Sequence, residues 1–188
     1  MRCAWAGPEK IYLDYHDTEW GVPEYDSRAL WEKLILDGFQ AGLSWITILK
    51  KRDAFREAFA GFDPDIIATW GDTEVQALLK NPGIIRHRGK IEATIRNARV
   101  WQEIEAREGF DQYLWKYVDG RPLQNRFATQ AEVPAHTPLS QQISKDLKSR
   151  GFTFCGPTIV HAFMEAVGMV NDHITCCDRH DIVAQMGR

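Results

Sequence analysis

The stretch Gly151-Phe152-Thr153-Phe154-Cys155-Gly156-Pro157-Thr158 decides the fold, because it separates two segments of helical spacing, 140–148 and 158–167. Glycine at 151 and at 156 permits a tight turn between them. Free backbone N–H groups at the start of the second helix are suited to bind a phosphate without reading a base. The stretch therefore predicts a helical hairpin, which is either a phosphate-binding element or a purely structural turn.

Helical spacing continues on both sides of this hairpin, and no segment alternates with period two for long enough to require a strand. Asp26 and Asp63 stand where helix N-caps are expected, and 43–59 reads as one helix. Thr73 and Gln76 resemble a capping box. The predicted fold class is all-α, with residues 1–188 forming one compact unit or two helical lobes around a cleft.

Composition bounds the class of protein. The chain has 188 residues, of which 44% are hydrophobic, and a formal net charge of −3. No apolar run reaches the roughly 18 residues that a membrane-spanning helix needs, and the first residues lack the apolar segment of a secretory signal. We therefore expect a cytoplasmic protein with no membrane partner. Net acidity argues against coating of nucleic acid, but basic residues cluster in 84–99 and 145–150.

Cysteine and histidine residues gather near both ends of the chain. Cys3 and His16 lie near the N-terminus, and His173, Cys176 and Cys177 lie near the C-terminus. His173 and Cys177 are four residues apart, so they share one face of a helical turn. Because disulfides are rare in the cytoplasm, Cys3, His16, His173 and Cys177 suggest a structural zinc site. Spacing alone leaves open that these thiols only pack, or that Cys176 competes with Cys177.

Five further segments carry a resemblance to a known family. They are 2–5, 15–23, 40–45, 83–91 and 170–173. With the hairpin, they resemble the bacterial 3-methyladenine DNA glycosylase I family of the helix-hairpin-helix DNA glycosylase superfamily. The resemblance implies a helical glycosylase fold and a structural Zn²⁺ that joins the termini through Cys3, His16, His173 and Cys177. It favours Cys177 over Cys176, because the family's ligand follows the histidine by four positions.

The resemblance also implies a pocket for a base flipped out of the duplex. 3-Methyladenine in DNA is cationic, so each well-placed aromatic ring would stabilise it by about 1–2 kcal/mol. The aromatic residues that match the family's pocket are Trp5, Tyr12, Tyr15, Trp20 and Trp45. Taken singly, each of them also suits a hydrophobic core.

Asp37 stands where the family has a glutamate that reads the base, and its side chain is one methylene shorter. Its hydrogen bonds to the base are therefore either direct or bridged by water. The competing interpretation makes Asp37 a surface residue near the end of a helix. The residues expected to contact DNA lie in the basic segments and the hairpin: Arg86, Arg88, Lys90, Lys148, Gly151 and Gly156.

The expected chemistry needs little help with the leaving group, because the base is already positively charged. Rate enhancement is expected from flipping, desolvation and stabilisation of the sugar cation, with Asp37 as the tentative electrostatic residue. Many relatives have an aspartate where this sequence has Asn171, so no conventional catalytic aspartate is assigned, and Asp172 is expected to make local hydrogen bonds. No lysine lies between Gly151 and His173, which predicts a monofunctional hydrolase.

The expected partner is double-stranded DNA that contains alkylated adenine, bound by a monomer. Two alternatives stay open. One is a non-catalytic module that binds alkylated DNA, and the other is a glycosylase for another alkylated purine.

Overall fold

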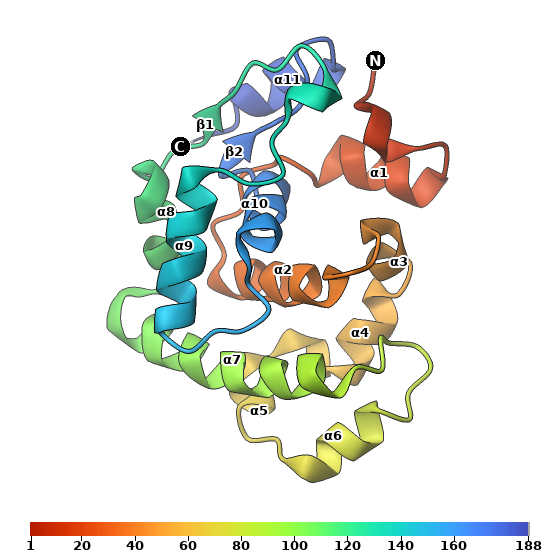
Figure 1. Cartoon of the computed structure of the whole chain (residues 1–188), viewed down its shortest axis with the longest axis vertical. Helices are drawn as coiled ribbons and strands as arrows, with labels where there is room; N and C mark the ends of the chain where they lie inside the picture. Colours follow the sequence, from red (N-terminus) through yellow and green to blue (C-terminus); the bar gives the residue numbers. More distant parts are fainter. Residues whose placement is uncertain (188) are drawn as a thin grey trace.

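The computed structural model describes residues 1–187, which fold almost entirely into helices (Figure 1). The α-helices in chain order are α1 (Lys10–Thr18), α2 (Ser27–Gln40), α3 (Trp45–Leu49), α4 (Arg52–Ala58), α5 (Pro64–Ile67), α6 (Asp72–Leu78), α7 (Arg88–Glu108), α8 (Phe110–Trp115), α9 (Pro138–Ser149), α10 (Pro157–Ala166) and α11 (Asp178–Ala184). Short 3₁₀ turns cover Ala4–Ala6, Ala60–Phe62, Lys116–Val118 and Gln130–Glu132. None of the helices described is long and apolar enough to cross a membrane.

A two-residue parallel pairing is the only sheet within residues 1–187. Strand β1 (Leu123–Gln124) pairs with β2 (Val170–Asn171), with Leu123 opposite Val170. The all-α prediction is confirmed as a mostly helical fold, and the pairing anchors the irregular segment 121–138 to the segment that follows α10.

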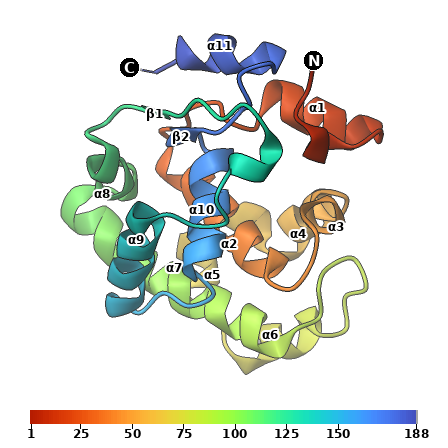
Figure 2. The same cartoon turned by 45° about the horizontal axis from the view of Figure 1, so that its top comes forward.

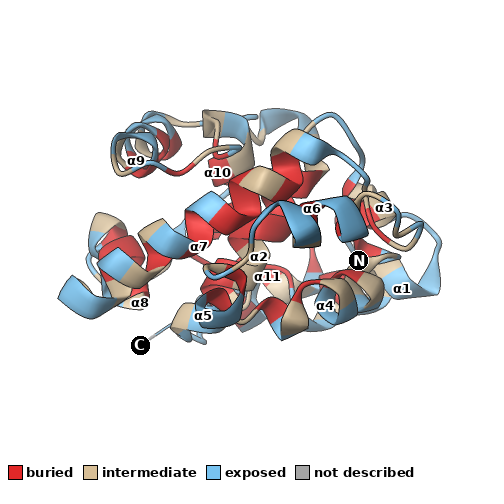
Figure 3. Cartoon of the chain, turned by 90° about the horizontal axis from the view of Figure 1, so that it is seen from below, coloured by how far each residue is buried: buried red, intermediate tan, exposed pale blue. Residues whose placement is uncertain are grey.

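The core lies where α2, α7 and α10 meet, and Figure 3 shows buried residues concentrated there. Leu30 and Trp31 of α2 are fully buried, and the Trp31 Nε1–H donates to the carbonyl of Phe62 at 3.0 Å. α10 packs against both α9 and α2 (Figures 1 and 2). At the opposite end from α6, the first helix α1 and the last helix α11 lie close to each other.

Two helix starts follow the predicted capping. The carboxylate of Asp26 accepts hydrogen bonds from the first N–H groups of α2, and that of Asp63 does the same for α5. The predicted box at Thr73 and Gln76 is wrong. Instead, α6 starts at Asp72, and the Gly71 N–H donates to the Glu74 carboxylate at 2.8 Å.

The single helix expected over 43–59 is also wrong, because it divides into α3 and α4. The Lys51 N–H donates to Ile48 rather than to the carbonyl four residues back, which tightens the turn between them. The Lys51 ammonium donates to the carbonyls of Pro82 and Gly83, so tertiary contacts hold this break in place.

The hairpin between α9 and α10 is held by side chains of its neighbours. Asn97 of α7 both donates to and accepts from the backbone of Thr153, at 3.1 and 3.0 Å. Gly151 has φ +105°, a conformation that favours glycine. Gly156 has φ −62°, and a Cβ there would meet no atom within 4 Å. The fold therefore requires glycine at 151, whereas Gly156 borders open space.

Candidate functional site

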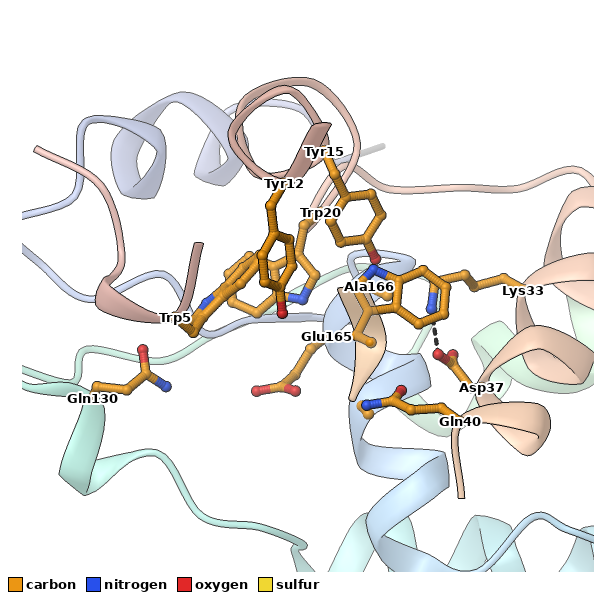
Figure 4. Close-up of a pocket in the computed structure, with 12 residues that line it drawn as sticks. Trp5, Tyr12, Tyr15, Trp20, Lys33, Asp37, Gln40, Gln130, Glu165 and Ala166 are labelled. Carbon is orange, nitrogen blue, oxygen red and sulfur yellow. Dashed lines mark hydrogen bonds and ion pairs between the residues drawn. The ribbon is translucent and has the colours of Figure 1, made fainter. Parts of the chain in front are cut away.

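A cavity of about 230 Å³ opens between α1, α2, α3 and α10 (Figure 4). All five aromatic residues predicted for a base pocket line it: Trp5, Tyr12, Tyr15, Trp20 and Trp45. Its polar lining comes from Lys33, Asp37, Gln40, Gln130 and Glu165. The structure therefore brings together residues from both ends of the chain around one space.

The aromatic rings brace one another at an angle rather than stacking face to face. The ring centroids of Trp5 and Trp20 are 4.8 Å apart at 66°, and those of Tyr15 and Trp45 are 5.4 Å apart at 44°. Tilted and edge contacts of this kind are favourable for aromatic pairs, and they support each ring from the side. This packing holds the rings in fixed orientations around the cavity.

Asp37 is buried at 1% exposure, so it is not the surface residue of the competing interpretation. Its Oδ1 accepts from the Lys33 ammonium one helical turn earlier on α2 (Figure 4). Burial raises the pKa of Asp37, although the Lys33 charge opposes that shift, and burial lowers the pKa of Lys33. The carboxylate expected to face a base thus already has a cationic partner.

Polar atoms of this wall remain available to a ligand. Among the residues described, Asp37 Oδ2 and Trp45 Nε1 are buried without a hydrogen-bond partner. Burial, with a further contribution from Asp37, raises the pKa of Tyr15 well above its ordinary value, which keeps its phenol protonated as a donor. The Lys33 Nζ lies 3.8 Å from the centroid of the Trp45 ring, so this face already accommodates a cation.

Sequence reasoning missed four polar residues of the cavity: Lys33, Gln40, Gln130 and Glu165. The spacing of Lys33 and Asp37 at i and i+4 was an available signal for their ion pair. The available signal for Glu165 was an acidic residue in the mostly apolar segment 157–166, four residues after His161. Gln130 lies in the 121–138 loop, where no periodicity indicates which way a side chain points.

The four predicted metal ligands form one buried group, although they lie up to 174 residues apart in the chain. The Cys177 Sγ is 3.4 Å from His173 Nδ1 and 3.5 Å from His16 Nε2, and the Cys3 Sγ is 3.6 Å from His173 Nδ1. Tetrahedral coordination with Zn–S near 2.3 Å and Zn–N near 2.0–2.1 Å would separate such atoms by about 3.5 Å. This Cys₂His₂ group could therefore hold a metal ion.

Partners outside this group orient both imidazoles. The second nitrogen of His16 lies 2.8 Å from Asp17 Oδ1, and that of His173 lies 3.1 Å from the Trp20 carbonyl. Carboxylate and carbonyl partners of this kind fix the tautomer of metal-binding histidines. Cys176 is exposed and stands outside the group, as the family resemblance implied, whereas spacing alone had left the choice between Cys176 and Cys177 open.

The predicted DNA-contact residues divide into exposed and buried members. Arg86, Arg88 and Lys148 are exposed, but the Arg88 guanidinium pairs with Asp72 and Glu92 at 3.4 and 3.1 Å. Lys90 is only 6% exposed, and its ammonium donates to the backbone carbonyls of residues 39 and 41. The expectation that Lys90 contacts DNA is therefore not kept, because its ammonium is bound to the carbonyls at the end of α2.

The hairpin and the start of α7 lie side by side. The rings of His87, the N-cap of α7, and Phe154, in the hairpin, meet edge to face at 6.0 Å. A Cβ at Gly89 would lie 3.8 Å from the Phe154 ring. These contacts bring the two predicted phosphate-binding segments together at one surface.

Asn171 and Asp172 have local partners. The Asn171 amide donates to Gln124 at 2.8 Å and to the His180 carbonyl at 2.9 Å, which accounts for it structurally. Asp172 Oδ1 accepts from the Asn125 amide at 2.6 Å, the kind of local bond expected for it. Neither residue lines the aromatic cavity.

Known proteins resemble this chain in both sequence and fold. The family model described as methyladenine glycosylase matches residues 5–180. The DNA-3-methyladenine glycosylase of Haemophilus influenzae is 48% identical over 94% of this chain and 96% of its own length. The crystal structure of a 3-methyladenine DNA glycosylase I has a TM-score of 0.94 at 51% identity, covering 96% of this chain and all of that one. A second solved structure, a tyrosine-to-phenylalanine variant of such an enzyme in complex with 3-methyladenine, has a TM-score of 0.92 at 39% identity, covering 95% and 97%. The chain belongs to the methyladenine glycosylase family.

Proposed function

We propose that this protein is a monofunctional DNA glycosylase that hydrolyses the bond between 3-methyladenine and deoxyribose in alkylated double-stranded DNA. The observation that carries the proposal is the cavity of five aromatic side chains, in a chain whose relatives are named for this activity. A flipped cationic purine would replace water in the cavity and gain stacking and cation–π attraction. The Lys33 ammonium lies over the Trp45 ring, so a cation fits on that face, but its own charge repels a cationic base.

The reaction breaks the bond between the sugar C1′ and the purine nitrogen. The bonding electron pair moves onto the base and neutralises its charge, and water adds to C1′ and loses a proton. Because the base departs without being protonated, the protein acts by holding the flipped nucleotide, by excluding bulk water and by placing negative charge near the sugar cation. Asp37 is the proposed electrostatic residue, and Trp5, Tyr12, Tyr15, Trp20 and Trp45 are the proposed base-binding set.

The proposed metal of the Cys₂His₂ group is Zn²⁺ in a structural role. Two thiolate and two imidazole ligands with no open position suit a structural zinc ion. Burial raises the pKa of the Cys3 thiol to about 12, so a thiolate at this depth needs a cation beside it. The ion would tie the segment before α1 to the segment before α11 and supply no step of the chemistry.

The proposed DNA surface consists of the α9–α10 hairpin and the start of α7, which makes this a helix-hairpin-helix element. Gly151 permits the turn, and open space at Gly156 allows a phosphate to approach the backbone. Arg86 and Lys148 would add phosphate contacts, and Arg88 would contribute less because acidic partners already neutralise it. A monomer of residues 1–188 would suffice for this binding, and the bacterial cytoplasm is where such DNA would be met.

Release of free 3-methyladenine from methylated duplex DNA, measured by chromatography, tests the proposal. We expect release by the wild type and a loss of at least tenfold in Trp45→Ala, with unchanged non-specific DNA affinity. Trp70→Ala is the matched control, because Trp70 packs on Phe59 outside the cavity. Binding of methylated DNA without base release would instead identify a non-catalytic module, and release of another purine alone would identify a different glycosylase.

A further inference from the structure

A second cluster of metal-ligand side chains lies beside the aromatic cavity, and the proposed glycosylase reaction does not use it. The His161 Nε2 is 3.4 Å from Asp172 Oδ2 and 3.9 Å from Glu165 Oε1. One ligand atom from each of the three residues lies within 4.8 Å of the others. Glu165 lines the cavity, and Figure 4 shows its side chain directed into that space.

The two carboxylates do not satisfy the imidazole as they stand, although Glu165 and Asp172 lie close enough to share a proton. His161 is 2% exposed, and both of its ring nitrogens lack a hydrogen-bond partner among the residues described, as does Asp172 Oδ2. The separations of 3.4 and 3.9 Å exceed the usual 2.7–3.2 Å of an N–H···O bond. No lysine or arginine within residues 1–187 pairs with either carboxylate. Two neighbouring acids and an unpartnered imidazole are thus buried together without a compensating cation.

The same separations suit ligands that share a metal ion. Metal–nitrogen and metal–oxygen bonds of about 2.0–2.2 Å at tetrahedral angles put neighbouring ligand atoms roughly 3.4 Å apart, and wider angles put them farther apart. His161 and Glu165 are four residues apart on α10 and so share one face of that helix. The Asn125 amide, bound to Asp172 Oδ1 at 2.6 Å, fixes the third ligand from outside the cluster. The cavity at Glu165 supplies a path of entry.

We propose that His161, Glu165 and Asp172 form a second metal site, which takes a divalent transition-metal ion. One imidazole and two carboxylates are ligands suited to Mn²⁺ and Zn²⁺, in contrast to the two thiolates of the Cys₂His₂ group. Three protein ligands leave coordination positions open, and Glu165 places the ion next to the cavity. The second ion is therefore held more weakly than the ion at the termini and exchanges with solvent.

Titration of the zinc-loaded protein with Mn²⁺ tests the proposal, because Mn²⁺ does not compete well for thiolates. Loss of the free Mn²⁺ signal in electron paramagnetic resonance counts bound ions without any measurement of activity. We expect one saturable Mn²⁺ per wild-type chain, and at least tenfold weaker binding in Glu165→Gln and in His161→Gln. Equilibrium dialysis against Zn²⁺ should likewise give two ions per wild-type chain and one in each variant.

Glu19→Gln is the matched control, because Glu19 is a carboxylate outside the cluster. It lines a second cavity, which shares Tyr15 and Lys33 with the aromatic cavity. It should bind Mn²⁺ like the wild type. If His161→Gln does not fold, Glu165→Gln decides alone, since that side chain is partly exposed and its replacement keeps the shape. A wild type that binds one Zn²⁺ and no Mn²⁺, or variants that bind Mn²⁺ equally well, would overturn the proposal. The cluster of His161, Glu165 and Asp172 would then be stabilised by a shared proton and not by a metal ion.

Discussion

The positive charge of Lys33 changes the electrostatics of the aromatic cavity for a positively charged base. Its ammonium lies over the Trp45 ring and holds the carboxylate of Asp37, so the cation-binding features of this wall already have a cation. A base that is cationic in DNA becomes neutral as it leaves the sugar. The ammonium therefore opposes the bound substrate more strongly than it opposes the departing base, which is ground-state destabilisation.

Lys33→Met should consequently lower KM for methylated DNA by about tenfold, a change of ~1.4 kcal/mol, and should lower kcat as well. Steady-state release of 3-methyladenine measures both constants. Lys33→Arg keeps the charge and is the matched control, with KM close to that of the wild type. Unchanged KM and kcat in Lys33→Met would show that the Lys33 charge is not felt at the base.

The sequence predicted elements best where a local interaction decides them. Asp26 and Asp63 cap their helices through their own neighbours, so single positions were enough to place α2 and α5. The break between α3 and α4 depends on carbonyls more than 30 residues from Lys51, and no local pattern reports such a partner. Lys90 was misplaced for the same reason, because its burial depends on the end of α2.

The surface formed by the hairpin and the start of α7 should bind DNA mainly through phosphates. Arg86→Ala and Lys148→Ala should each reduce the slope of log affinity against log salt by about 0.9, and Arg88→Ala should reduce it less. Fluorescence anisotropy with an undamaged duplex at several salt concentrations measures the slopes. Arg107→Ala is the matched control, because Arg107 lies on α7 about 28 Å from Arg88 along the helix axis.

Lys90→Met supplies the opposite pattern to those variants. It should lower thermal stability and leave the salt slope unchanged, because the Lys90 ammonium binds carbonyls inside the protein. A reduced slope in Lys90→Met, or unaltered slopes in both Arg86→Ala and Lys148→Ala, would contradict this assignment of the surface.

The carboxylate of Asp146 joins helix α9 to the α8 region. Asp146 accepts from the hydroxyls of Tyr113 and Tyr117 at 2.8 and 2.6 Å, and Arg150 lies beside it. Burial would raise the pKa of Asp146, but these hydrogen bonds and the Arg150 charge outweigh it and lower the pKa. A lowered pKa contributes stability above the ordinary aspartate value, and that stability is lost as the pH falls through the native value.

Asp146→Asn should therefore lower the free energy of unfolding by ~1–2 kcal/mol at pH 7, and the deficit should shrink as the pH falls below about 4. Urea titrations of wild type and variant across this range measure the difference. Asp53→Asn is the control, because that side chain is almost fully exposed and should show no deficit at either end. A deficit independent of pH would indicate lost packing rather than lost charge.

At the scale of the whole molecule, the two ends of the chain contact each other. Residues near the N-terminus supply Trp5, Tyr12 and Tyr15 to the cavity, and α10 supplies Glu165. Ligand chemistry could suggest from sequence that Cys3 and His16 meet His173 and Cys177, because one ion needs four donors. The convergence of Lys33, Glu165 and Gln130 on the same cavity depends on how complete helices pack, which residue types alone do not specify.

Removal of the proposed zinc should therefore loosen the base cavity together with the termini, since α1 carries both His16 and two of the aromatic side chains. Cys3→Ala should reduce the tight metal content after dialysis from one ion per chain to none. It should also lower Tm by about 6–12 °C, equivalent to ~3 kcal/mol for a chain of this length. Elemental analysis and calorimetry measure the two effects. Cys176→Ala is the matched control, because this exposed thiol adjoins a ligand without belonging to the group. Equal losses of Tm in both variants would show that the cysteines stabilise the chain by packing and not by holding a metal.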